Sequence, residues 1–100
     1  MAWGPYDVKL APDSTLWLTY CANSVRRNEQ TNESDNHLLV YRFDLDGEPL
    51  WEAPFRIPTA YNAVPKLAMT QYGAYVTYRR RLTFGERLRA FFLTREGAVQ

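Results

Sequence analysis

The sequence contains one cysteine, five glycines and no long apolar run, and each scarcity excludes a class of protein. Cys21 cannot form a disulfide within the chain, which excludes a disulfide-stapled scaffold and favours a reducing compartment. No stretch approaches the roughly 20 apolar residues that a transmembrane helix needs. The first residues include neither a basic cluster nor an apolar run, so we expect no signal peptide. These absences predict a cytoplasmic protein with no membrane partner.

Residues suited to catalysis are equally scarce. The one histidine, His37, has no nucleophile or metal ligand at a recognisable spacing, so a solvated role is favoured over a catalytic one. No Cys or His pair has zinc spacing, and there is no glycine-rich phosphate loop. The segment Asp44-Leu45-Asp46-Gly47-Glu48 imitates the start of a calcium loop, but Pro49-Leu50-Trp51 offers no further side-chain oxygen. We predict no enzyme, no cofactor and no metal site.

Aromatic residues, by contrast, make up 15% of the chain, a share that suits half-buried pleated strands. A length of 100 residues predicts a single domain spanning 1–100. Alternating and β-branched stretches predict antiparallel strands at 7–11, 15–21, 38–45, 49–52, 74–82 and 87–94. We expect Trp17, Tyr41, Phe43 and Val76 to lie at least partly inside, and Cys21 to be buried.

The intervening segments have turn and loop compositions. Asp46-Gly47 supplies the positive φ of a tight hairpin turn, and Thr83-Phe84-Gly85-Glu86 predicts a second hairpin. The polar stretch 23–36 predicts a long exposed loop. The stretch 53–65, which contains three prolines, predicts an irregular connection, and a short helix is the alternative within 60–71.

The two halves of the chain resemble each other weakly. Lys9-Leu10-Ala11 recurs as Lys66-Leu67-Ala68, the segments 16–20 and 74–78 both end in Thr-Tyr, and Asp46-Gly47 recurs as Glu96-Gly97. The matches predict two degenerate copies of a four-stranded unit, at about 6–53 and about 63–100. The expected fold class is all-β, with these repeats arranged as blade-like units, as a small β-sandwich or as a curled sheet.

The segment Phe43-Asp44-Leu45-Asp46-Gly47-Glu48-Pro49-Leu50-Trp51 resembles the strand-turn-strand of a β-propeller blade of the quinoprotein-like type. The resemblance implies that Asp44 and Gly47 shape the turn and that Trp51 packs between neighbouring blades. The spacing from Asp to Trp is one residue shorter than in the family, and Thr94 replaces the Asp in the second copy. Two blades cannot close a propeller, so the resemblance implies self-assembly, a fragment, or a sandwich or curled sheet. It brings no quinone and no dehydrogenase activity.

Charge is unevenly distributed, although the net charge is only +1. Residues 1–52 contain four basic and nine acidic side chains, a balance of −5, whereas residues 53–100 contain eight basic and two acidic ones, a balance of +6. This asymmetry indicates an electrostatic partner, or halves that complement each other.

The basic residues gather in one predicted hairpin. The candidate binding residues are Arg79, Arg80, Arg81, Arg87 and Arg89, with Tyr78 and Phe84 as aromatic anchors. Strand alternation predicts Arg79 and Arg81 on one face, and Arg87 and Arg89 together on one face of the partner strand. Two interpretations remain open: a solvated strand end whose arginines pair with the acidic half, or a surface for an acidic partner.

We therefore predict a non-enzymatic interaction module that binds an acidic protein surface or a nucleic-acid backbone, for example a small inhibitor of a nucleic-acid-handling machine. The isoelectric point near 7.9 does not favour nucleic acid. The alternative is an oligomeric, propeller-type lectin or small-ligand binder in which Trp17 and Trp51 line sites between blades. A hydrolase that uses Asp44, Asp46 or His37 is the least favoured reading.

Overall fold

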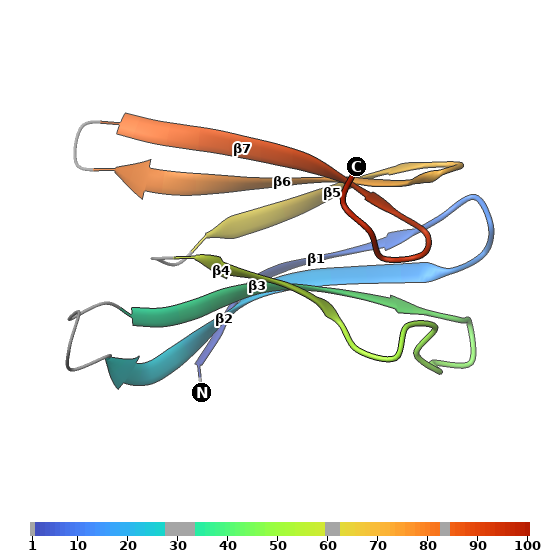
Figure 1. Cartoon of the computed structure of the whole chain (residues 1–100), viewed down its shortest axis with the longest axis horizontal. Helices are drawn as coiled ribbons and strands as arrows, with labels where there is room; N and C mark the ends of the chain where they lie inside the picture. Colours follow the sequence, from blue (N-terminus) through green and yellow to red (C-terminus); the bar gives the residue numbers. More distant parts are fainter. Residues whose placement is uncertain (1, 28–33, 60–62, 83–84) are drawn as a thin grey trace.

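In a computed structural model, the chain forms two antiparallel β-sheets (Figure 1). The structure describes the backbone of residues 2–27, 34–59, 63–82 and 85–100, and the side chains of residues 6–22, 36–59, 63–79 and 88–100. The first sheet has the strand order β1-β2-β3-β4 and the second the order β5-β6-β7. The strands are β1 (Ala2–Leu10), β2 (Leu16–Arg27), β3 (Ser34–Phe43), β4 (Phe55–Thr59), β5 (Val64–Thr70), β6 (Gly73–Leu82) and β7 (Gly85–Thr94). The predicted all-β, antiparallel fold is confirmed.

The described residues contain no helix, and therefore none long and apolar enough to cross a bilayer. The helical alternative for 60–71 is wrong where it overlaps β5. In that strand Pro65 and Leu67 are buried whereas Lys66 and Ala68 are exposed, which is the two-residue period of a strand. Pro65 is tolerated because β5 is an edge strand of its sheet.

The ladder between β2 and β3 is longer than expected. Its register continues from Leu16↔Phe43 to Asn23↔Asn36, and after an irregularity to Arg27↔Ser34. The prediction of an exposed loop over 23–36 is therefore wrong at both ends, and residues 28–33 lie outside the described part. The error arises because ladder hydrogen bonds join backbones and do not require apolar side chains; Asn36 itself is buried.

The fourth strand of the first sheet is also not where the sequence predicted it. Pro49 makes only an isolated bridge to Phe43, and the strand that completes the sheet is β4, within the stretch expected to be irregular. Phe55, Ile57 and Thr59 are half-buried and alternate with exposed Arg56 and Pro58. Proline is compatible with this strand because β4 lies at the edge of the sheet.

The core lies between the inner faces of the two sheets. Trp17, Leu38 and Val40 from the first sheet pack with Val76 and Leu93 from the second, and all five are fully buried. The predicted burial of Trp17, Val76 and Cys21 is confirmed; Tyr41 and Phe43 are half-buried.

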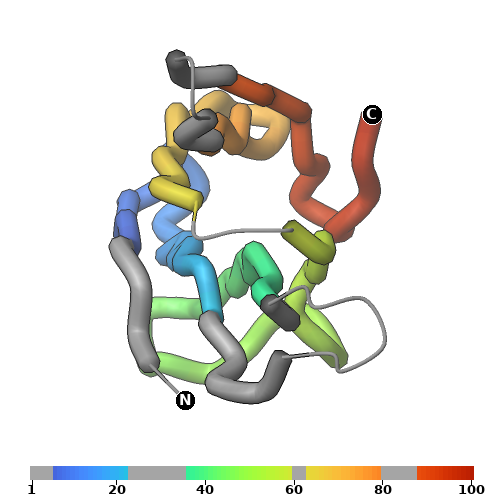
Figure 2. The backbone as a smooth tube through the Cα atoms, turned by 90° about the vertical axis from the view of Figure 1, so that its left-hand side faces the viewer, coloured from blue at the N-terminus to red at the C-terminus, as the bar shows by residue number. Residues whose placement is uncertain are grey.

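The edge strands β1 and β5 lie side by side, so that the seven strands curl around the interior without closing into a barrel (Figure 2). At this junction a side chain replaces a ladder hydrogen bond, because the backbone N–H of Leu67 donates to Oδ2 of Asp7 at 2.9 Å.

Strands β3 and β7 are each followed by a turn with the same hydrogen-bond pattern. The N–H of Asp44 donates to the carbonyl of Glu48 at 2.9 Å, and the N–H of Thr94 donates to that of Ala98 at 2.8 Å. Gly47 and Gly97 have φ of 87° and 86°, the left-handed region that favours glycine.

Only some of the sequence matches between the two halves occupy equivalent pairing positions in the two sheets. Thr19 pairs with Val40, which lies four residues before the turn at Asp44. Thr77 pairs with Ala90, which lies four residues before the turn at Thr94, so the shared Thr-Tyr pairs occupy equivalent positions. The lysine match does not, because Thr77 pairs with Lys66 whereas Thr19 pairs with Asp7 rather than Lys9.

Candidate functional site

The predicted arginine hairpin is formed by β6 and β7. The pairing register is Tyr78↔Arg89, Arg79↔Leu88, Arg80↔Arg87 and Arg81↔Glu86. All five arginines therefore occupy positions at one end of this ribbon, which we call the arginine end (residues 79–89). The predicted faces need one refinement: position 80 pairs with position 87, so by alternation positions 79 and 81 fall on the opposite face of the hairpin from positions 87 and 89.

The described side chains of the arginine end differ in exposure. Arg79, Leu88 and Arg89 are exposed. Tyr78 is half-buried and packs edge-on against Phe91, with ring centroids 6.3 Å apart, so much of its ring belongs to the core. The side chains of Arg80, Arg81 and Arg87, and the whole of Phe84, lie outside the described part.

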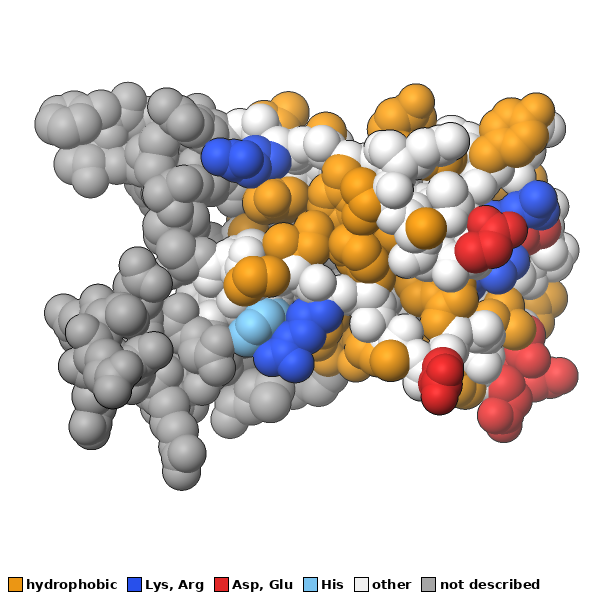
Figure 3. Space-filling view, in the orientation of Figure 1, with side chains coloured by type: hydrophobic (Ala, Val, Ile, Leu, Met, Phe, Trp, Pro, Cys, Tyr) orange, Lys and Arg blue, Asp and Glu red, His pale blue; other side chains and the backbone are white. Residues whose placement is uncertain are grey.

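Four of the described carboxylates gather at the other end of the molecule. The longest extent of the chain is 42 Å, and the hairpin that joins β6 to β7 lies at one end of it in Figure 1. Asp44, Asp46 and Glu48 follow β3 and Glu96 follows β7, in turns at the opposite end, where red side chains gather in Figure 3. These four carboxylates are too distant to pair with the arginine end of the same molecule.

Arg42 connects several elements at this acidic end. Its Nη2 donates to Oδ2 of Asp13 at 2.9 Å and its Nη1 donates to the carbonyl of Arg95 at 3.1 Å. Its Cζ lies 5.9 Å from the ring centroid of Trp17. The Thr15 hydroxyl, which donates to Asp13, and then Arg42 hold the pKa of Asp13 below its ordinary value. Arg42 thus links three parts of the fold, and it also lines the groove beside them.

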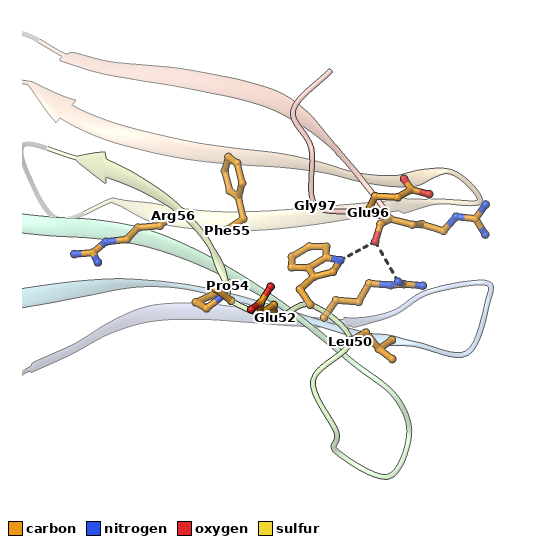
Figure 4. Close-up of a pocket in the computed structure, with 11 residues that line it drawn as sticks. Leu50, Glu52, Pro54, Phe55, Arg56, Glu96 and Gly97 are labelled. Carbon is orange, nitrogen blue, oxygen red and sulfur yellow. Dashed lines mark hydrogen bonds between the residues drawn. The ribbon is translucent and has the colours of Figure 1, made fainter.

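An open groove of about 770 Å³ lies beside this network (Figure 4). Its walls come from the end of β3, the segment that joins β3 to β4, the start of β4 and the last turn of the chain. They include Arg42, Trp51, Phe55, Arg56 and Glu96. Trp51 is half-buried and also packs against Trp17. Trp17 and Trp51 were predicted to line a sugar site together. Trp17 is fully buried and cannot contact a ligand, whereas Trp51 borders the groove.

The remaining candidates for chemistry have structural surroundings. Oδ1 of Asp44 accepts hydrogen bonds from the backbone N–H groups of Asp46 and Glu48, both at 2.9 Å, so this carboxylate stabilises the turn. Nη2 of Arg56 lies 3.2 Å from both ring nitrogens of His37. Within the described part of the chain, no three His, Cys, Asp or Glu side chains come together as metal ligands.

One surface was not predicted: the face of the first sheet that points away from the second. Its side chains form an apolar grid of three rows, namely Tyr6, Tyr20 and Leu39; Val8, Leu18 and Tyr41; and Leu10, Leu16 and Phe43. Tyr6, Val8 and Leu10 are 67%, 47% and 63% exposed. The signal was present in the uninterrupted apolar runs 16–18 and 38–41, since strands that are apolar at every position have two faces to cover.

Comparisons with known proteins supply no family: no family model, no curated protein and no solved structure matches the chain.

Proposed function

We propose that the chain is a non-enzymatic interaction module whose arginine end binds an acidic protein surface. The observation that carries the proposal is the register of the hairpin, in which Arg80 pairs directly with Arg87. Like charges at directly opposite positions repel and destabilise the ladder. An anionic partner relieves that repulsion, and guanidinium groups bind carboxylates through paired hydrogen bonds.

The separation of charge along the molecule supports a partner outside the chain. Asp44, Asp46, Glu48 and Glu96 lie at the opposite end, so these four carboxylates do not neutralise the arginine end within one molecule. Glu86 pairs with Arg81 and Asp35 lies at the start of β3 at the same end, but these two acids are fewer than the five arginines. Exposed Leu88 pairs with Arg79 and shares its face of the hairpin, so it offers an apolar contact beside that charge. Apolar contacts flanked by arginine are typical of protein interfaces.

A protein partner is favoured over nucleic acid because the chain as a whole is nearly neutral. Its net charge is only +1, and a cluster of acids at one end repels a long phosphate backbone that extends past the arginine end. A compact acidic surface contacts the arginine end without meeting those acids. Cys21 is the only thiol of the chain, which suits a reducing, cytoplasmic setting.

A capture experiment with matched variants tests the proposal. The purified chain, the double variant Arg80→Glu/Arg87→Glu and the control Lys66→Glu/Arg95→Glu are used as baits, with and without nuclease, and retained proteins are identified by mass spectrometry. Lys66 and Arg95 are exposed and lie outside the hairpin, and the control changes the net charge equally. We expect an acidic protein that the unmodified chain and the control retain and the hairpin variant loses. Capture that survives the hairpin reversal, or that nuclease abolishes, would overturn the proposal.

A further inference from the structure

The apolar grid is uniform in composition but not in exposure, because Tyr20 is buried and the other grid side chains of β2 and β3 are half-buried. None of its nine side chains is charged, and its outer column, Tyr6, Val8 and Leu10, is about half to two-thirds exposed. The rings of Tyr20, Tyr41 and Phe43 stack nearly parallel, with interplanar angles of 7°, so these three side chains pack on one another. Covering these exposed apolar side chains with a partner is favourable because it removes apolar area from water.

Opposite charges border the two ends of the grid. Arg56 of β4 pairs with Leu39, at the end of the first row. Beyond the third row, Phe43 leads directly into the turn that contains Asp44, Asp46 and Glu48, which lies on the side of β3 away from the second sheet (Figures 1 and 2). A surface that covers the grid therefore meets a cation at one end and carboxylates at the other.

The outer face of the second sheet does not match this surface. That face includes Lys66 and Arg79 among Tyr75, Ala90 and Leu88. Packing it on the grid buries a lysine and an arginine against uncharged side chains, which is costly. The grid of a second copy has no such charges, and the net charge of +1 gives little repulsion between copies.

We propose that the grid is the interface of a symmetric dimer, in which the first sheets of two copies pack face to face. The two-fold axis crosses the strands at the middle row of Val8, Leu18 and Tyr41, so that the first row of each copy covers the third row of the other. This orientation brings Arg56 of each copy to the turn 44–48 of the other. The arrangement is the sheet-on-sheet packing of a β-sandwich, with an isologous contact.

The size of the grid sets the strength of this dimer. Strands about 4.8 Å apart and residues about 3.4 Å apart give a three-strand, five-residue surface a footprint on the order of 250 Å². A standard interface buries about 800 Å² per partner, so the grid is its apolar centre and the charged borders form the rim. The dimer is therefore reversible and depends on protein concentration.

Analytical ultracentrifugation over a wide range of concentration tests the interface. We expect the unmodified chain to pass from monomer to dimer, and Val8→Lys to weaken the dimer at least about tenfold, since it places a charge in the apolar contact. Tyr75→Lys is the matched control, because Tyr75 is 51% exposed on the outer face of the second sheet. If circular dichroism shows that Val8→Lys is unfolded, Leu10→Lys replaces it.

A charge exchange tests the orientation. Arg56→Glu should weaken the dimer several-fold, and adding Glu48→Arg should restore it, because the exchanged pair attracts again. A chain that stays monomeric at all concentrations, a dimer that tolerates a lysine in the grid, or an assembly that Tyr75→Lys abolishes would each overturn the proposal. A dimer indifferent to Arg56→Glu would overturn the two-fold orientation.

Discussion

The indole Nε1 of Trp51 donates a hydrogen bond of 2.7 Å to the carbonyl oxygen of Arg95, which joins the first sheet to the last turn of the chain. The ring of Trp51 also meets Trp17 edge-on, with centroids 5.2 Å apart and an interplanar angle of 89°. Gly97 lies against the other side of this indole, since a Cβ atom there would be 3.3 Å from Cε2 of Trp51. Trp51 therefore packs between Trp17 of the first sheet and the last turn of the chain.

Two substitutions of Trp51 should separate the contribution of its hydrogen bond to stability from the contribution of its packing. Trp51→Phe keeps an aromatic ring and loses the donor; because Arg42 still donates to the Arg95 carbonyl, we expect a loss of about 1 kcal/mol in the free energy of unfolding. Trp51→Ala also loses the contact with Trp17, and we expect about 2–3 kcal/mol. Urea unfolding measures both values. Equal losses for the two variants would show that the packing contributes nothing.

Gly47 and Gly97 form a matched pair. Both have left-handed φ near 87°, so alanine at either position costs about 1 kcal/mol of strain. A Cβ at Gly47 meets nothing within 4 Å, whereas a Cβ at Gly97 presses on Trp51. We therefore expect Gly97→Ala to lower the melting temperature more than Gly47→Ala. The difference should disappear in a Trp51→Ala background, and a difference that persists there would assign the cost to another contact.

The Asp13–Arg42 pair should make the free energy of unfolding depend on pH in the acidic range. The pKa of Asp13 is lower in the folded chain than its ordinary value of 3.8, so its contribution is present above that pH and is lost as the pH falls through the folded pKa. At neutral pH we expect Asp13→Asn to be less stable than the unmodified chain by up to about 1 kcal/mol, since the pair is partly exposed.

Unfolding curves at neutral and strongly acidic pH measure this effect. The stability gap between Asp13→Asn and the unmodified chain should close on acidification. A cycle with Arg42→Gln isolates the coupling between the two side chains. A gap that is unchanged by pH would contradict the assignment.

Tyr20 should make the free energy of unfolding depend on pH in the alkaline range. Burial, and then its hydrogen bond with Tyr41, raise the pKa of Tyr20 to about 12, from the ordinary value of 10.0. Below pH 10 both the folded and the unfolded chain keep this proton. Between about pH 10 and 12 the unfolded chain loses it and the folded chain keeps it, so the free energy of unfolding falls across this interval.

Absorbance titration of the tyrosines, combined with unfolding curves, checks this prediction. Tyr20→Phe should be less sensitive to pH over the same interval because its ring does not ionise. If the variant and the unmodified chain lose stability equally, Tyr20 is not the group responsible.

The sequence by itself determined the local features of this protein. Gly47 and Gly97 marked both turns correctly because positive φ is a property of a single residue and its neighbours. The aromatic and β-branched runs located β2, β3, β6 and β7, and predicted that Trp17 and Val76 are buried, because side-chain alternation is a local consequence of the pleat.

Tertiary structure decided whatever depends on a neighbour distant in sequence. Residues 55–59 form β4 because the edge of β3 offers them backbone partners, which composition does not record. The contact between β1 and β5, where the N–H of Leu67 donates to Asp7, likewise joins residues that are 60 positions apart in the sequence.

The apolar grid shows the same division. The runs 16–18 and 38–41 established that β2 and β3 have two apolar faces, but only the packing of the second sheet selected which face it covers. The chain buries the face of Trp17, Leu38 and Val40 and leaves that of Leu18 and Tyr41 outward, because a three-stranded sheet covers one face of its neighbour and not both.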